Sequence, residues 1–141
     1  YVGADGAKHR PIMIHRVVFG SIERFIGILT EHFAGAFPTW LAPVQVKLLP
    51  IADRHLDYLN AIKDRLEKCG IRCEIDDRSE KIGFKIRSAQ LEKVPYMLVA
   101  GDKDIENSTV SVRSRKDGEQ GACSVDEFIQ KIEKEIETKS L

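Results

Sequence analysis

The sequence predicts an α/β domain over residues 44–141, with a mixed, mostly parallel sheet of about five strands and three helices. Apolar and polar residues alternate at 44–50, which is the period of a strand. Apolar residues then recur at helical spacing over 56–69, and the period of two returns at 71–75. A strand, a helix and a strand within this length form the crossover unit of a parallel sheet.

The helix expected at 56–69 has one apolar side and charged residues on its other faces. Gly70 follows it as a C-terminal stop, because glycine enters the left-handed region without steric cost. The apolar stripe consists of Leu56, Leu59, Ile62, Leu66 and Cys69.

A polar loop at 76–80 follows the second strand, with Ser79 placed to cap a helix that runs to about Lys93. Pro95 ends this helix, and the run 96–100 is continuously apolar, as expected of a central strand. Gly101-Asp102 predicts a turn after this strand. The helix is expected to bury Ile82, Ile86 and Ala89.

The C-terminal part predicts two more strands and a helix. Residues 109–115 alternate, with Val110 and Val112 on one side, and a turn at 117–118 leads to a short strand near 122–123. Ser124 and Glu127 form a capping box for the last helix. The core stripe of that helix consists of Val125, Phe128, Ile129, Ile132 and Ile136.

Residues 1–37 predict a separate body. The nearly continuous apolar run 11–19 is typical of a strand buried on both faces, and Ser21 can cap an amphipathic helix after it. One strand and one helix cannot cover both faces of that strand. We therefore expect this body to be the end of a domain whose other elements lie upstream in a longer protein.

The stretch 38–43 joins the two bodies. Pro38 and Pro43 lack a backbone N–H and restrict φ, so no helix passes through them. Trp40 and Leu41 are large apolar groups that favour burial. The sequence therefore predicts a rigid joint, with the two bodies packed against each other.

Composition excludes several classes of function. The 22 Lys and Arg balance the 22 Asp and Glu, so no net charge attracts DNA or an anionic membrane. The apolar runs are shorter than a membrane span, and no signal pattern is present, so we expect a cytoplasmic protein. The three cysteines form no C-x-x-C pair, which favours reduced thiols over a disulfide framework or a zinc site.

Few residues offer catalytic chemistry. No Walker A loop and no G-x-G-x-x-G follows a strand. His15 is interpretable as a hydrogen-bonded core histidine or as one metal ligand. Arg24, in the first turn of the N-terminal helix, is either a surface group or a phosphate contact. Independent catalysis is not expected.

A binding role has more support, because open α/β sheets bind ligands beyond the carboxyl ends of their parallel strands. The loop 76–80 lies at such an end. Cations that could supply a nucleic-acid contact near it are Lys81, Lys85, Arg87, Lys93, Arg113 and Arg115. The alternative is that most of these charges are solvated faces.

The motif H-R-V-V-F-G-S-I-E-R-F-I-G-I-L-T-E-H at 15–32 resembles the third signature motif of class II aminoacyl-tRNA synthetases, in the form of the threonyl-tRNA synthetase family. The stretch 38–46 is similar to the join between catalytic core and anticodon-binding domain in that family. The resemblance implies that Arg24 contacts ATP. It also implies that His15 is one of three protein ligands of a zinc ion that recognises threonine, with the other two upstream.

Three further motifs resemble the core of the family's anticodon-binding domain: D-x-R-x-E-K-I-G-x-K-I-R from Asp76, V-P-Y-M-L-V-x-G-D from Val94 and V-x-V-R from Val110. Threonine anticodons keep guanine and uracil at their second and third positions. The resemblance implies that these bases are read by Ser79, Lys93, Asp104 and Arg113. The family's usual residues at the first three positions are asparagine, arginine and glutamate, whereas Arg113 matches the pattern.

The resemblance implies the C-terminal part of a ligase that recognises the anticodon loop of tRNA(Thr). The full-length parent would join L-threonine to tRNA(Thr) with ATP through threonyl-adenylate, as a homodimer containing zinc. This fragment alone is expected to be inactive, to bind neither ATP nor zinc tightly, and to contact neither membrane nor DNA. The alternative is a non-catalytic synthetase-like accessory module for protein or RNA binding.

Overall fold

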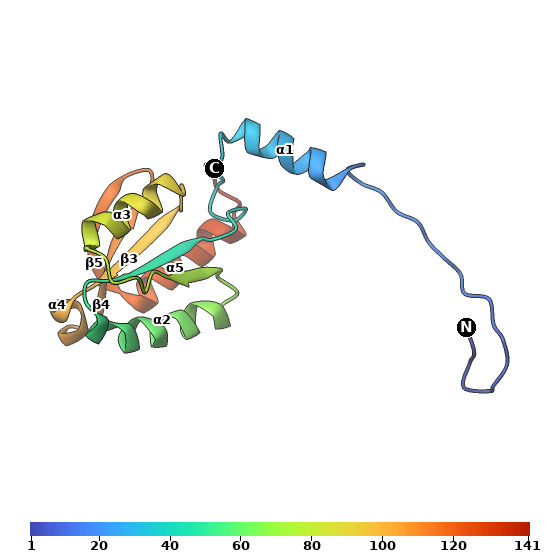
Figure 1. Ribbon diagram of the computed structural model, residues 1–141, viewed down its shortest axis with the longest axis horizontal. Coiled ribbons are helices and arrows are strands. Elements are labelled where there is room, and N and C mark those ends of the chain that lie inside the picture. Colours follow the sequence, from blue (N-terminus) through green and yellow to red (C-terminus); the bar gives the residue numbers. More distant parts are fainter.

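The computed structural model describes residues 1–141 and shows an α/β domain from which an N-terminal segment extends (Figure 1). One helix, α1 (Ile22–His32), belongs to the extending segment. The remaining elements form the domain and are, in chain order, β1 (Val46–Pro50), the short 3-10 helix η1 (Asp53–His55), α2 (Leu56–Lys68), β2 (Cys73–Ile75), α3 (Ile82–Leu91), β3 (Tyr96–Ala100), α4 (Asp102–Glu106), β4 (Thr109–Ser114), β5 (Gly118–Ser124) and α5 (Val125–Glu137).

The five strands form one mixed sheet in the order β2-β1-β3-β4-β5. Strand β1 pairs in parallel with both β2 and β3, as the crossover pattern predicts. Strands β3 and β4, and then β4 and β5, pair antiparallel. The predicted α/β fold and strand number are confirmed. The four pairings divide evenly between parallel and antiparallel, because β4 and β5 form a hairpin rather than a second crossover.

Helices α2 and α5 cover one face of the sheet, and α3 lies on the other (Figure 1). The main core lies under α2 and α5, where Leu66 of α2 and Phe128 of α5 are almost fully buried among strand residues such as Leu98. The core under α3 is much smaller and centres on Leu49, Ala89 and Met97. The predicted stripes of α2 and α5 are therefore confirmed as core faces, except that Cys69 lies just past the end of α2 and is exposed.

Three local expectations differ from the structure. Strand β1 begins at Val46, not at Val44. Ser79 does not cap α3, because the loop continues for two more residues and Lys81 takes the N-cap position without a side-chain hydrogen bond. The expected turn at 101–102 opens into the short helix α4, whose Asp104 carboxylate accepts a hydrogen bond from the Gly101 backbone N–H at 3.0 Å.

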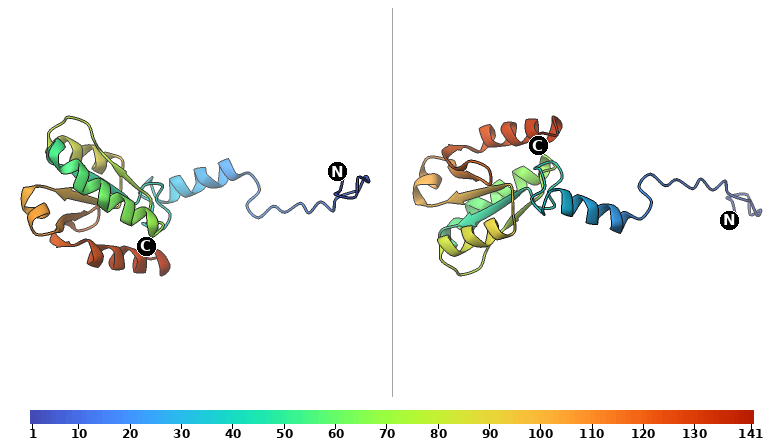
Figure 2. Two further views of the ribbon diagram at one scale, coloured as in Figure 1. Left: turned by 90° about the horizontal axis from the view of Figure 1, so that it is seen from below. Right: turned by 90° about the horizontal axis from the view of Figure 1, so that it is seen from above.

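The predicted strand at 11–19 is wrong for this chain. The segment has no hydrogen-bonded neighbour and runs away from the domain, with Ile12 92% exposed (Figure 2). A strand needs a partner for its backbone groups, and no other element reaches this segment. Helix α1 forms as predicted, with Ser21 as its N-cap, but it buries no residue. The expected packing of the two bodies is limited to residues 33–42.

Side chains of the domain bind backbone carbonyls of the stretch 34–43, which from here on we call the joint. Arg115 donates to the carbonyls of Ala36 and Phe37, and Arg72 donates to those of Trp40 and Ala42. Arginine suits this role because its planar fork offers several donors at once. The joint is therefore fixed to the domain through its main chain.

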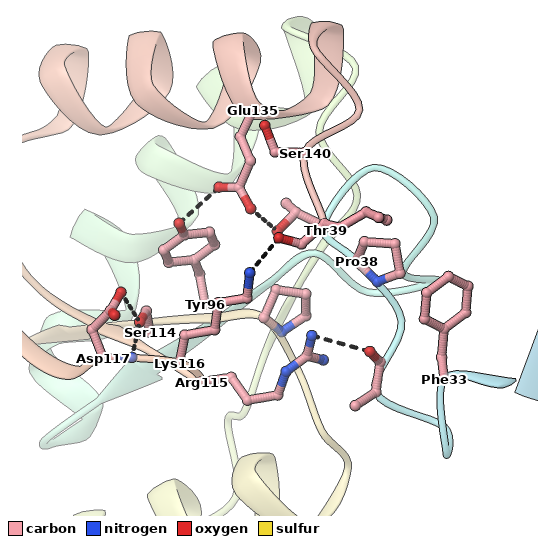
Figure 3. A pocket seen from close by; sticks show the side chains of 13 residues that line it. Phe33, Pro38, Thr39, Tyr96, Ser114, Arg115, Lys116, Asp117, Glu135 and Ser140 are labelled. Atoms are coloured by element: carbon pink, nitrogen blue, oxygen red, sulfur yellow. Dashed lines mark hydrogen bonds between the residues drawn. The ribbon is translucent and has the colours of Figure 1, made fainter.

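A pocket of about 230 Å³ lies where the joint, the start of β3 and the end of α5 meet (Figure 3). Glu135 bridges its walls, accepting from the Thr39 hydroxyl at 2.6 Å and from the Tyr96 hydroxyl at 2.7 Å. Burial and the neighbouring Glu135 carboxylate raise the pKa of Tyr96. Hydrogen bonds to Glu135 thus cross this pocket and tie the joint to α5.

An ion pair organises the loop between β2 and α3. The Asp76 carboxylate is almost fully buried and accepts from the Arg78 guanidinium at 2.8 and 2.6 Å. Hydrogen bonds from Arg78 hold the pKa of Asp76 below its ordinary value of 3.8. Lys85 of α3 is also buried, and its ammonium donates to the Pro50 carbonyl at 3.2 Å.

A first prediction tests the division between packed domain and extending helix. Leu98→Ala should lower the free energy of unfolding by about 2–5 kcal/mol, because it leaves a cavity in the main core. Ile26→Ala, on α1, should change that free energy by no more than about 0.5 kcal/mol. Chemical denaturation measures both, and a comparable loss for Ile26→Ala would show that α1 packs in solution.

A second prediction concerns acid stability. Because the pKa of Asp76 is lower in the folded chain, the Asp76–Arg78 pair stabilises the fold above the ordinary pKa and loses this contribution as pH falls between about 5 and 2. Asp76→Asn should therefore show a smaller loss of unfolding free energy over that range. Asp77→Asn, at an exposed neighbouring position, should keep the wild-type slope. Equal slopes for all three proteins would contradict the assignment.

Candidate functional site

One half of the sheet has a face that α3 does not cover and that the short helix α4 contacts only at one end. In β4, Val110 and Val112 point into the core under α5, so the alternating residues point to the opposite face, where α3 packs against β1 and β3. These residues are only half-buried, since α3 does not extend over β4 and β5. We call this face of β4 and β5 the open strip; it carries Thr109, Ser111, Arg113, Glu119 and Ala122.

Arg113 lies at one end of the open strip. It sits opposite Met97 of β3 on one side and Glu119 of β5 on the other. Its guanidinium donates one hydrogen bond, to the Glu119 carboxylate at 3.0 Å, and its side chain is 29% exposed. The other N–H donors of this guanidinium have no acceptor within the chain, so they can serve a ligand.

Asp104 borders the other end of the open strip. Its carboxylate accepts from the Ser111 hydroxyl at 3.0 Å while also accepting from the Gly101 backbone N–H. Helix α4 therefore holds this carboxylate against β4. Asp104 and Arg113, two of the four predicted base contacts, thus flank the same uncovered face.

The other two predicted contacts lie at opposite ends of α3. Ser79 is exposed in the loop before this helix, and Lys93 follows it with a φ of 59°. A helix of 10 residues spans about 15 Å, so these two side chains are not brought together. The Lys93 ammonium donates to the Ala34 carbonyl, which commits it to the joint in this structure.

The predicted group of cations near loop 76–80 does not form. Lys85 is buried against Pro50, and Arg115 is taken up by carbonyls of the joint at the opposite edge of the sheet. Lys81 and Arg87 remain exposed. We expected this group because the cations are close in sequence. In the fold, Lys85 and Arg115 bind acceptors in different parts of the domain.

A cluster that the sequence patterns did not indicate lies at the carboxyl edge of β1 and β3. The buried His55 accepts from the Ala52 backbone N–H through Nδ1 at 3.0 Å, so its Nε2 carries the proton and donates to Asp102 at 2.9 Å. Arg54 binds the same carboxylate, and together they hold the pKa of Asp102 well below its usual range. This cluster joins the turn after β1 to the start of α4 through the Asp102 carboxylate.

His15 and Arg24, which the resemblance assigns to zinc and ATP, have no further ligand groups beside them in this chain. His15 is exposed and has no hydrogen-bond partner in this chain. Within residues 1–141, no three His, Cys, Asp or Glu side chains are grouped to hold a metal ion, and zinc needs three or four ligands. Arg24 is likewise exposed on α1. These residues do not by themselves fit a zinc or ATP site, and we derive no chemistry through either.

The thiols are not arranged as nucleophiles. All three cysteines are free, and burial raises the pKa of Cys73 to about 11. A thiol with such a pKa is protonated at neutral pH and reacts slowly.

None of the helices in the structure has both the length and the apolar character that crossing a membrane requires.

Comparison with known proteins assigns the fold. The family model described as the anticodon binding domain matches residues 45–135. A threonine–tRNA ligase from Caldanaerobacter subterraneus subsp. tengcongensis is 65% identical over all 141 residues, and the chain spans 22% of that relative's length.

Two solved structures share the fold. The RNA-binding domain of threonyl-tRNA synthetase from Cryptosporidium parvum has a TM-score of 0.76 at 30% identity, covering 82% of this chain and 29% of the other. Prolyl-tRNA synthetase from the same organism has a TM-score of 0.65 at 31% identity, covering 72% of this chain and 22% of the other. The resemblance expected from the sequence motifs is confirmed, and the chain belongs to the anticodon-binding domain family, in the form found in threonine–tRNA ligases.

Proposed function

We propose that this chain recognises the anticodon loop of tRNA(Thr) as part of a threonine–tRNA ligase. The observation that carries the proposal is the open strip, a polar sheet face bordered by Arg113 and Asp104 in a chain of the anticodon-binding family. An uncovered sheet face without large apolar groups suits a polar ligand. Net charge does not favour nucleic acid, so recognition depends on individual side chains.

The chemistry of the open strip suits unpaired bases. Bases in a tRNA loop can be unstacked, and they then present their edges to side chains. Arg113 has donors free for the O6 and N7 acceptors of guanine, which lie in one plane as its guanidinium does. Asp104 supplies a carboxylate at the other end of the same face. We propose that Ser79 and Lys93 contact the loop from the two ends of α3.

The proposed parent enzyme would ligate L-threonine to tRNA(Thr) with ATP, through threonyl-adenylate, in the cytoplasm. In that parent, Arg24 would contact ATP and His15 would be one zinc ligand, with the catalytic core and a second subunit as partners. The apolar residues of α1 and of 11–19 are exposed here, as expected of elements that pack in a catalytic core. The fragment would be inactive by itself.

Binding to two RNA stem-loops tests this proposal. One carries a threonine anticodon, and the other has its middle guanine replaced by adenine. The chain should bind the first more tightly, and the affinity should be measured at several salt concentrations, because phosphate contacts give affinity without discrimination. Equal affinities, or no binding, would favour a non-catalytic accessory module instead.

A third prediction concerns Arg113. Arg113→Ala should weaken binding to the matched stem-loop by about 1–3 kcal/mol and affect the altered one much less, if Arg113 reads the edge of a base. Isothermal titration or fluorescence anisotropy measures both affinities.

Arg65→Ala is the matched control, because it removes the same charge from α2 on the covered side of the sheet, where Arg65 pairs with Asp126. This variant should leave the preference for the matched stem-loop unchanged. Uniform weakening by Arg113→Ala on both stem-loops would identify Arg113 as a phosphate contact.

A further inference from the structure

An irregularity in the β4–β5 hairpin places Glu119 opposite Arg113. The pairing runs regularly up to Val112 opposite Gly121, and then shifts so that Arg113 lies opposite Glu119. Gln120 is the extra residue of this β-bulge. Gly121 has a φ of 85°, in the left-handed region that favours glycine. Without the bulge, Gln120 would lie opposite Arg113.

Glu119 and Gln120 point to opposite faces, as neighbours in a strand do, and the bulge decides that Glu119 is the one opposite Arg113. The Gln120 side chain accepts from the Lys131 ammonium of α5 at 2.6 Å, on the covered face of the sheet. Glu119 instead lies on the open strip and accepts from Arg113 at 3.0 Å. The fold therefore places a carboxylate, and not an amide, beside the guanidinium.

This carboxylate changes what Arg113 can bind. A lone arginine on an exposed face attracts any phosphate, and such contacts carry no information about base sequence. Pairing with Glu119 offsets the positive charge and fixes the plane of the guanidinium through one of its nitrogens. The remaining N–H donors can still pair with two acceptors on the edge of a base.

We propose that Glu119 is a specificity-determining residue, an inference that rests on the proposed function. Glu119 positions the Arg113 guanidinium for the edge of a guanine. It also suppresses binding of Arg113 to RNA phosphates. Glu119 is 71% exposed, so it is accessible at the RNA surface while it holds this pair. Its role is exerted through Arg113 and does not require direct contact with the base.

The test compares Glu119→Gln with the wild-type chain on the matched stem-loop and on the stem-loop lacking the middle guanine. Glu119→Gln should lower the affinity ratio between the two by about tenfold, chiefly because the altered stem-loop binds more tightly. Its binding should also depend more steeply on salt, because Arg113 becomes available to phosphates. Glu119→Asp, which keeps a carboxylate, should retain most of the wild-type ratio.

Asp126→Asn is the matched control, because it also removes one negative charge from an exposed ion pair, with Arg65 on the covered side of the sheet. Its ratio should equal that of the wild type. Thermal unfolding should show Glu119→Gln to be folded, since exposed ion pairs contribute little to stability. A merely structural role would change affinity for both stem-loops by the same factor.

The outcomes separate the two proposals. A wild-type chain that prefers the matched stem-loop, together with an unchanged ratio in Glu119→Gln, would overturn the role of Glu119 and leave the proposed function standing. A wild-type chain that binds both stem-loops equally would overturn both. A fall in the ratio shared by Asp126→Asn would also reject the inference, because total charge would then explain it.

Discussion

The structure depends on an unequal covering of its sheet. Helices α2 and α5 bury one face of β1 to β4, whereas on the other face α3 reaches only the parallel half and the short α4 contacts one end of β4. Side chains on the uncovered part of β4 and β5 must therefore be compatible with water. This constraint accounts for the polar residues that alternate with Val110 and Val112, and it leaves one face of the domain available for a polar ligand.

The same arrangement separates charges that keep the domain together from charges that can bind a partner. Arg72 and Arg115 hold carbonyls of the joint, Arg78 holds Asp76, and Lys85 is buried against Pro50. Each of these cations binds an acceptor within the domain or the joint, and Lys85 is also buried. Arg113 differs, because a single bond to Glu119 leaves most of its donors free. The proposed recognition therefore relies on how Arg113 is paired, more than on how many charges the chain carries.

The hydrogen bonds that hold the joint restrict how it can move relative to the domain. Main-chain carbonyls of residues 36–42 accept hydrogen bonds from Arg72 and Arg115, and the Thr39 hydroxyl donates to Glu135 of α5. A segment held through its backbone cannot reorient without breaking several hydrogen bonds.

The sequence by itself determined most of the fold and only part of the site. Periodicity, Gly70 and the Ser124 capping box predicted the parallel crossover, the central strand and α5, because these signals are local. Motif resemblance indicated Arg113 and Asp104, which the fold places on one face. Only the tertiary structure decided that Lys85 is buried, that Lys93 contacts the joint, that 11–19 has no strand partner and that a bulge sets Glu119 beside Arg113. Each of these outcomes depends on contacts between residues distant in sequence or on strand register, which local patterns do not encode.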